Sequence, residues 1–148
     1  FDYPEPEFAV PLGQASTAVE GTGTDLTIIT YGNGTWMSRR VARRIHSDHG
    51  VGIRIVDLRW IAPLPVEDMV REAKVTGRAL VVDEGRRTGG MAEPIMTALV
   101  EGCPHVEMAR VTGHDTYIPL AAAANLVLVQ EPDIAAAALK MLGLEAAQ

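Results

Sequence analysis

The chain has 148 residues, of which 47% are hydrophobic and 22% charged, with a formal net charge of −6 and one cysteine. This size and balance fit one globular domain with a sizeable core, and no apolar run is long enough to span a bilayer. The acidic charge argues against nucleic acid and anionic membranes as partners, because both attract clustered lysine and arginine. The single Cys103 excludes an internal disulfide and fits a reducing compartment.

The first half of the chain predicts an arm followed by two strand–helix pairs. Residues 1–24 are rich in Pro, Gly and Glu, and we expect an extended arm or linker with a lead-in strand or loop before a domain at 25–148. Residues 26–31 predict an apolar strand, and residues 35–49 have the spacing of an amphipathic helix. Residues 53–58 predict the next strand, with a helix from about residue 65 to 75. No signal peptide is recognisable, and a start without methionine indicates a processed product or an excised fragment.

The second half continues the alternation of strands and helices. Residues 78–83 and 106–111 predict strands, residues 91–101 predict a helix, and residues 131–142 predict a closing helix. Residues 119–130 are ambiguous, because their first part favours helix and their second part favours strand. This alternation predicts an α/β fold: a three-layer α/β/α domain with about five strands in a mostly parallel sheet, and an antiparallel edge strand is compatible with it.

The most informative segment runs from Val81 to Ile95, where a β-branched strand ends in two carboxylates and crosses a turn with three glycines into a helix. Ligands or partner chains meet open α/β sheets at such strand ends. Asp83 and Glu84 are adjacent and should point to opposite faces, so an acid–base pair is not expected. We expect one of them to hold the turn by accepting backbone N–H bonds. Arg86 and Arg87 precede a helix N-terminus and either hold an anion or stay solvated.

A dinucleotide site is the main competing interpretation. A strand, the Gly32-Asn33-Gly34 turn, a helix and a second strand ending in Asp57 imitate the dinucleotide-binding pattern. The pattern fails where Met37 replaces the third glycine, because a large side chain keeps the helix away from the pyrophosphate.

The histidines do not predict a metal site. His46 and His49 are three residues apart, but no cysteine or carboxylate pattern completes a ligand set, so a surface pair is expected. His114 and Asp115 form the most reactive-looking doublet, at a predicted strand end. A structural role in a loop or an interface is favoured there over catalysis.

Several segments, taken in order, resemble one family. They are Val-Pro-Leu-Gly-Gln-Ala at 10–15, Asp-Leu-Thr-Ile-Ile-Thr-Tyr-Gly at 25–32, Val-Asp-Leu-Arg at 56–59 with Pro-Leu-Pro at 63–65, Thr-Gly-Arg at 76–78, Asp-Glu at 83–84 before Thr-Gly-Gly at 88–90, and Arg-Val-Thr-Gly-His-Asp at 110–115 with Ile-Pro at 118–119. Together they resemble the C-terminal domain of the β subunit of thiamine-diphosphate-dependent 2-oxo acid dehydrogenases, the E1 component, within the transketolase superfamily. Gln14, Pro65 and Tyr117 depart from the usual Lys, Asp and Pro of that pattern.

The resemblance implies a parent enzyme that oxidatively decarboxylates a 2-oxo acid, of the pyruvate or branched-chain type, and passes the acyl group to the E2 component. Thiamine diphosphate and Mg²⁺ carry that chemistry, and the family binds them with other domains. The Gly-Asp-Gly…Asn motif of the cofactor site is absent from this sequence. We therefore expect this chain alone to bind no cofactor or metal and to contribute no catalytic residue. The implied location is the bacterial cytoplasm or, in a eukaryote, the mitochondrial matrix.

The resemblance also implies that the chain serves assembly. Its implied partners are the E1 α subunit or an α-like domain, a second β copy, and the subunit-binding domain of E2. The residues expected at such interfaces are Thr88, Gly89, Gly90, Glu93, Glu101, His114 and Asp115. Two alternatives stay open: the corresponding domain of a transketolase, a deoxyxylulose-phosphate synthase or a ketoacid:ferredoxin oxidoreductase, and a dinucleotide-binding module.

Overall fold

The computed structural model describes residue 5 and residues 9–144, so the parts of the predicted arm and domain at 1–4, 6–8 and 145–148 lie outside the described residues. The strands are β1 (Ser16–Glu20), β2 (Leu26–Thr30), β3 (Ile53–Asp57), β4 (Arg78–Arg86) and β5 (Glu107–Gly113). The helices are α1 (Asn33–His49), α2 (Val66–Thr76), α3 (Ala92–Gly102) and α4 (Glu131–Leu142), with a 3₁₀ helix η2 (Ala121–Leu126) before α4.

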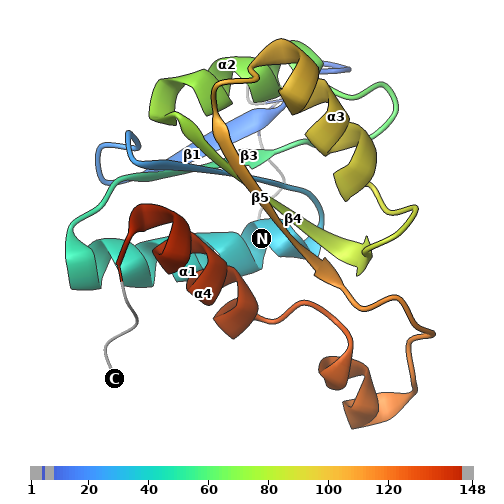
Figure 1. Ribbon diagram of the computed structural model, residues 1–148. Helices are drawn as coiled ribbons and strands as arrows, with labels where there is room; N and C mark the ends of the chain where they lie inside the picture. The colour runs from blue at the N-terminus through green and yellow to red at the C-terminus, as the bar shows by residue number, and fades with distance from the viewer. Residues whose placement is uncertain (1–4, 6–8, 145–148) are drawn as a thin grey trace.

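The strands form one five-stranded sheet in the order β1-β3-β2-β4-β5 (Figure 1). β2 pairs in parallel with β3 and β4, and β4 pairs in parallel with β5. β1 pairs antiparallel with β3, from Ser16 opposite Asp57 to Glu20 opposite Ile53. The predicted mostly parallel α/β sheet is confirmed, and its antiparallel edge strand comes from the segment predicted as an arm. The boundary at residue 25 stays a prediction.

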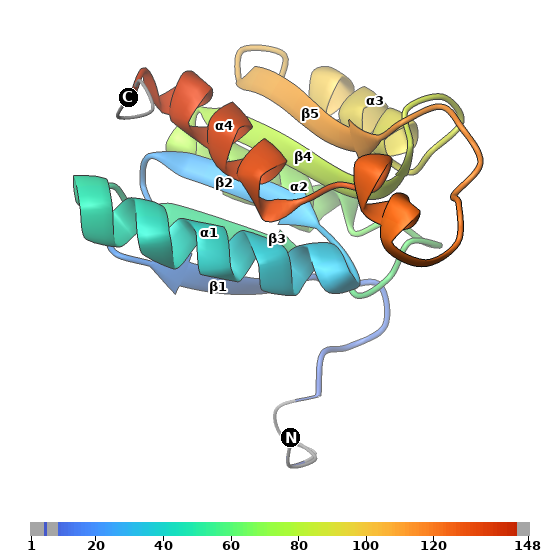
Figure 2. The same cartoon turned by 90° about the horizontal axis from the view of Figure 1, so that it is seen from below.

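Helices cover both faces of the sheet. α1 and α4 lie on one face and α2 and α3 on the other (Figures 1 and 2). Neighbouring strand residues therefore serve different layers: Ile28 packs with the α1/α4 layer and Ile29 with the α2/α3 layer, and both are fully buried. Strands buried on both faces need nearly continuous apolar sequence, and this explains the runs that predicted them. Among the described residues, no helix combines the length and apolar character that crossing a membrane requires.

Two segments differ in detail from the sequence prediction. β4 continues past Asp83 to Arg86, with a register shift between these two residues where it pairs with β5. An irregularity of this kind lets a strand bend at its end, which the strand propensity of the residues does not reveal. The ambiguous segment 119–130 forms neither a long helix nor a strand, but the short η2 followed by an extended stretch into α4.

A half-buried ion pair joins β3 to α2. Arg54 Nη1 lies 2.5 Å from Glu72 Oε2, and the two side chains are 16% and 9% exposed. Arg54 Nε also donates to the carbonyl oxygen of Gly23 at 2.7 Å. Each charge is therefore compensated inside the fold, as partly buried charges require.

Candidate functional site

The strands β2 to β5 run in parallel, so the four segments that leave them lie at one edge of the sheet, on the right in Figure 1. We call this edge the carboxyl edge and define it by residues 31–36, 58–65, 84–91 and 114–126. Ligands and partners of open α/β sheets meet the protein at this kind of edge. The segment predicted to matter most, Val81 to Ile95, forms its centre.

Asp83 organises the glycine-rich turn from within the core. Its side chain is fully buried, and its Oδ1 accepts from the Tyr31 hydroxyl at 2.5 Å and from the Gly85 amide at 2.7 Å. Its Oδ2 accepts from the amide of Ala92, the first residue of α3, at 2.7 Å. The prediction that one carboxylate of the pair holds the turn is confirmed. Burial, followed by the hydrogen bond to Asp83, raises the pKa of Tyr31, so its phenol stays protonated as the donor.

Glu84 points to the other face of the sheet. Its Oε1 accepts from the amide of Gly34 at 2.8 Å, in the first turn of α1. The helix N-terminus that would hold a pyrophosphate is thus already neutralised by a carboxylate of the same chain. Met37 is buried at the predicted third-glycine position, and Asp57 forms an ion pair with Arg59 at 2.8 Å. These contacts argue against a dinucleotide site.

Asp115 ties the segment after β5 to the glycine-rich turn. Its two carboxylate oxygens accept from the Thr88 amide at 2.8 Å and from the Thr88 hydroxyl at 2.7 Å. These bonds, with smaller contributions from Arg86 and Arg87, hold the pKa of Asp115 below its usual range. His114 is exposed, and its backbone amide donates to the carbonyl oxygen of Val127 at 2.9 Å. We name the Thr88–Asp115 contact the loop clamp.

The structure gathers most of the predicted interface residues but not all of them. Thr88, Gly89 and Asp115 border one groove together with Arg86, Thr116 and Tyr117. Gly90 and His114 adjoin this groove along the chain. Glu93 and Glu101 are exposed on α3, at its start and near its end, and lie about 12 Å apart along the axis. Glu101 is therefore remote from the loop clamp.

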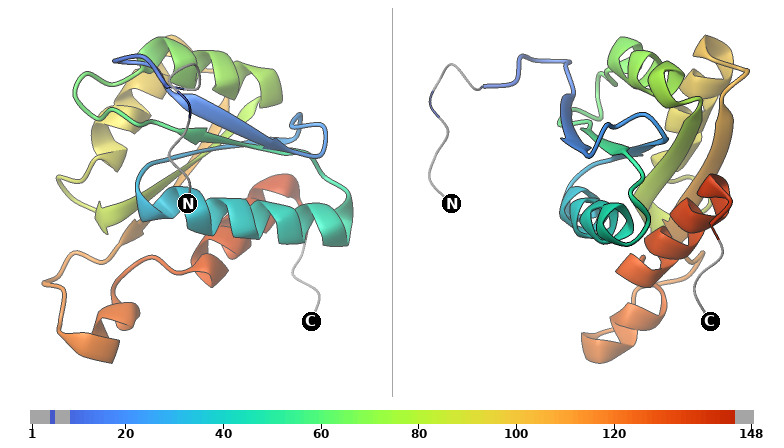
Figure 3. Two further views of the ribbon diagram at one scale, coloured as in Figure 1. Left: turned by 180° about the vertical axis from the view of Figure 1, so that it is seen from behind. Right: turned by 90° about the vertical axis from the view of Figure 1, so that its left-hand side faces the viewer.

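The sequence analysis missed a set of exposed apolar side chains at the carboxyl edge. Tyr117 is 96% exposed and Leu120 is 91% exposed, in a segment that projects from the layers (Figure 3). The same edge carries further exposed apolar side chains, namely Trp36, Trp60, Ile61, Ile118 and Leu126. Both tryptophans of the chain are thus in this set. The Tyr-Ile-Pro-Leu run at 117–120 could have indicated this surface. It is apolar, yet it lies between predicted elements and belongs to neither core layer.

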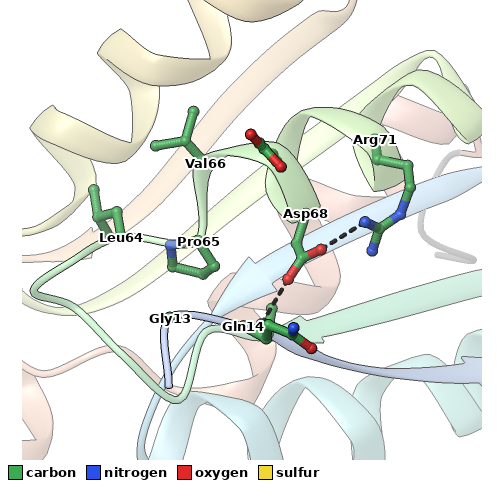
Figure 4. Close-up of a pocket in the computed structure, with 9 residues that line it drawn as sticks. Gly13, Gln14, Leu64, Pro65, Val66, Asp68 and Arg71 are labelled. Atoms are coloured by element: carbon green, nitrogen blue, oxygen red, sulfur yellow. Dashed lines mark hydrogen bonds and ion pairs between the residues drawn. The ribbon is translucent and has the colours of Figure 1, made fainter. Parts of the chain in front are cut away.

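A second pocket lies between the lead-in segment and the start of α2 (Figure 4). It is lined by Gln14 and Pro65, two of the three residues that depart from the family pattern, so these departures are neighbours in space. α2 begins after Pro65 without a side-chain cap. Asp68 instead accepts from the Ala15 amide at 2.8 Å and pairs with Arg71 at 2.5 Å. The Ala15 amide is the main cause of the lowered pKa of Asp68.

The described residues offer no ligand set for a metal. Within residues 5 and 9–144, no three His, Cys, Asp or Glu side chains come together as metal ligands would. His46 Nδ1 lies 2.9 Å from the carbonyl oxygen of Val51 and is occupied there.

Comparison with known proteins identifies the class. The family described as "Transketolase, C-terminal domain" matches residues 13–136, and the chain belongs to this family. The chain is 32% identical over 144 residues to the pyruvate dehydrogenase E1 component subunit beta of Bacillus subtilis, covering 95% of this chain and 43% of that subunit. The subunit of the same description from Staphylococcus epidermidis is 32% identical over 136 residues, with 90% and 41% covered. The chain therefore spans less than half the length of these relatives.

Solved structures share the fold. A split-gene transketolase, described as an inactive beta4 tetramer, aligns with a TM-score of 0.82 and 24% identity over 98% of this chain and 47% of that chain. A 2-oxoglutarate:ferredoxin oxidoreductase from Magnetococcus marinus aligns with a TM-score of 0.62 and 16% identity over 92% of this chain and 20% of that chain. Identities this low show a common architecture, which is the predicted transketolase C-terminal-like fold.

Replacing Asp83 tests whether its carboxylate holds the edge together. Asp83→Asn keeps the size but replaces one acceptor oxygen by a donor, so at least one buried N–H or O–H loses its partner. We expect the free energy of unfolding to fall by about 2–4 kcal/mol. Tyr31→Phe removes only one of the three bonds and should cost about 1–2 kcal/mol. Urea denaturation measures both, and equal stability of Asp83→Asn and the parent chain would contradict the assignment.

The loop clamp predicts how the pKa of Asp115 responds when Thr88 is replaced. Because the folded pKa of Asp115 is lowered, the clamp stays charged above the ordinary value of 3.8 and loosens only as the pH falls through the lower folded value. Thr88→Val removes the hydroxyl hydrogen bond, the largest cause, so the pKa of Asp115 should rise toward 3.8. Carboxyl-carbon NMR titration measures this, with Thr97→Val on α3 as a control that leaves the pKa unchanged. A Thr88→Val variant with the same Asp115 pKa as the parent chain would refute the clamp.

Proposed function

We propose that this chain is the C-terminal assembly domain of an E1-type 2-oxo acid dehydrogenase whose parent enzyme oxidatively decarboxylates pyruvate or a related 2-oxo acid. The relatives of pyruvate dehydrogenase E1 beta type support the enzyme class. The observation that carries the assembly role is the set of exposed apolar side chains at the carboxyl edge. A bacterial cytoplasmic location is part of the proposal and rests on the bacterial relatives.

In this proposal the chemistry belongs to other parts of the parent enzyme. Thiamine diphosphate with Mg²⁺ supplies the electron sink for decarboxylation when bound. The proposal gives the described residues of this chain no catalytic step, since no three His, Cys, Asp or Glu side chains among them come together as metal ligands would. Their contribution is to hold a surface in a fixed shape.

The exposed apolar side chains of the carboxyl edge support an interface there. A monomer rarely leaves several large apolar side chains together in water, and aromatic residues are enriched at the centres of interfaces. Tyr117 and Leu120 are almost fully exposed, although each has the apolar area of a core residue. The loops that carry this surface are held by Asp83, Glu84 and the loop clamp. A surface held in this way loses little conformational entropy when a partner binds.

The proposed occupant of the carboxyl edge is the rest of the parent enzyme, namely the α subunit or α-like domain and a second β copy. A finer proposal concerns E2, whose subunit-binding domain would need a basic docking surface. Glu93 and Glu101 are exposed on α3, and no ion pair among the described residues uses either of them. Free carboxylates on one helix suit attraction of such a basic surface.

Assembly is tested by polar substitution at the projecting segment. In the full-length parent enzyme, Tyr117→Ser and Leu120→Ser should each weaken subunit association by about tenfold or more, because each removes a large apolar contact. Val75→Ser is the matched control, since Val75 is exposed on α2. Sedimentation equilibrium measures the association, and thermal unfolding checks that each variant folds. Unchanged association in both variants would remove the proposed role of the carboxyl edge.

E2 docking is tested separately by charge reversal. Glu101→Lys should weaken binding of a cognate E2 subunit-binding fragment, because it replaces attraction by repulsion at the docking surface. Asp48→Lys on α1 carries the same charge change on another face of the protein and should leave the affinity unchanged. Isothermal calorimetry compares them. If Glu101→Lys binds as tightly as the parent enzyme, α3 is not the docking helix, whereas the assembly role of the carboxyl edge is unaffected.

A further inference from the structure

A polar crevice lies beside β5, the edge strand of the sheet. It is bounded by the end of β5 on one side and by the stretch that leads from η2 into α4 on the other (Figure 2). Its volume is about 490 Å³, within the range of sites for small molecules. The polar and charged side chains that line it are Arg87, Arg110, Thr112, His114, Asn125, Gln130 and Asp133. Most of these groups donate hydrogen bonds.

Arg110 is the unusual member of this crevice. It is half-buried, yet the only hydrogen bond that its guanidinium makes within the described residues is from Nη1 to the carbonyl oxygen of Arg87 at 3.3 Å. Arg54 is another half-buried arginine, and its guanidinium donates both to a carbonyl oxygen and to the Glu72 carboxylate. A guanidinium carries five N–H donors, and the hydrogen bond of Arg110 to Arg87 lies exposed to solvent, so a ligand that enters the crevice can reach the remaining donors. Arg110 therefore has donors available for an acceptor from outside the chain.

The charged side chains that line the crevice are mostly basic. None of the ion pairs among the described residues includes Arg86, Arg87 or Arg110. The one acidic side chain that lines the crevice, Asp133, already accepts from the Gln130 amide at 2.8 Å in the cap of α4. Asp115, which lies near Arg87, is held by Thr88 in the loop clamp. The lining carries the guanidinium groups of Arg87 and Arg110 against the single carboxylate of Asp133, so the crevice is locally cationic in a protein whose net charge is −6.

We infer that this crevice binds a small organic anion, a phosphate or carboxylate compound, between the guanidinium groups of Arg87 and Arg110. Guanidinium groups recognise both oxyanions through paired, charge-assisted hydrogen bonds. His114, Asn125 and Gln130 supply further polar contacts at the rim. The volume of the crevice lies in the range of sites for small molecules, and the inference does not depend on the proposed assembly function.

The test is a titration of the chain with pyrophosphate and, separately, with citrate, which represent the two kinds of oxyanion. Binding of at least one probe should saturate and shift the backbone NMR signals of residues 110–114 and 125–130. Arg110→Gln and Arg87→Gln should each weaken it by about tenfold, the loss typical for a hydrogen bond to a charged group. Lys140→Gln is the matched control, because it removes the same charge from an exposed position on α4 outside the crevice. Thermal unfolding establishes that each variant folds.

Three results would overturn the inference. The first is the absence of saturable binding for both probes. The second is equal weakening by Lys140→Gln, which would show a response to net charge instead of a site. The third is a set of shifted signals confined to residues that lie outside the crevice. Saturation by either probe, lost with the arginine variants and kept with Lys140→Gln, supports the site and identifies its oxyanion.

Discussion

Two adjacent carboxylates at the end of β4 hold the carboxyl edge of this domain. Asp83 and Glu84 point to opposite faces of the sheet, and each accepts from the N-terminal turn of a helix, α3 on one face and α1 on the other. A helix N-terminus has unsatisfied N–H donors and a partial positive charge, so a carboxylate there stabilises it. One dipeptide thus joins the two outer layers to β4.

The rest of the edge depends on this anchoring. With the start of α3 held by Asp83, the glycine-rich turn has a defined path, and the loop clamp joins it to the segment after β5. The exposed Tyr117 and Leu120 are therefore carried by backbone that is tied to the sheet on one side. The crevice around Arg110 lies along β5, the edge strand, and is lined by His114, Asn125 and Leu126 of the same segment.

The sequence predicted the fold in nearly all its elements, because the periodic apolar residues of both layers and the glycines and prolines at element ends act locally. That one carboxylate of the Asp83–Glu84 pair holds the turn also followed, since a carboxylate beside glycines can accept from their backbone N–H groups. The partners themselves did not follow: Tyr31 lies 52 positions from Asp83, and Thr88 lies 27 positions from Asp115. Such pairs arise from strand order, which local patterns do not encode.

The sequence by itself determined the layer architecture and the position of the glycine-rich turn, because hydrophobic period and turn chemistry are local properties. The order of its motifs also resembled the transketolase C-terminal domain family, to which the chain belongs. Only the tertiary structure decided which helix each carboxylate holds and that the 117–126 segment projects into solvent. It also decided that Arg110, within the described part of the chain, has no acidic partner such as Arg54 has. The physical reason is that the burial of a side chain and its hydrogen-bond or ion-pair partners depend on which distant segments become neighbours. Those neighbours are set by the order of the strands in the folded sheet.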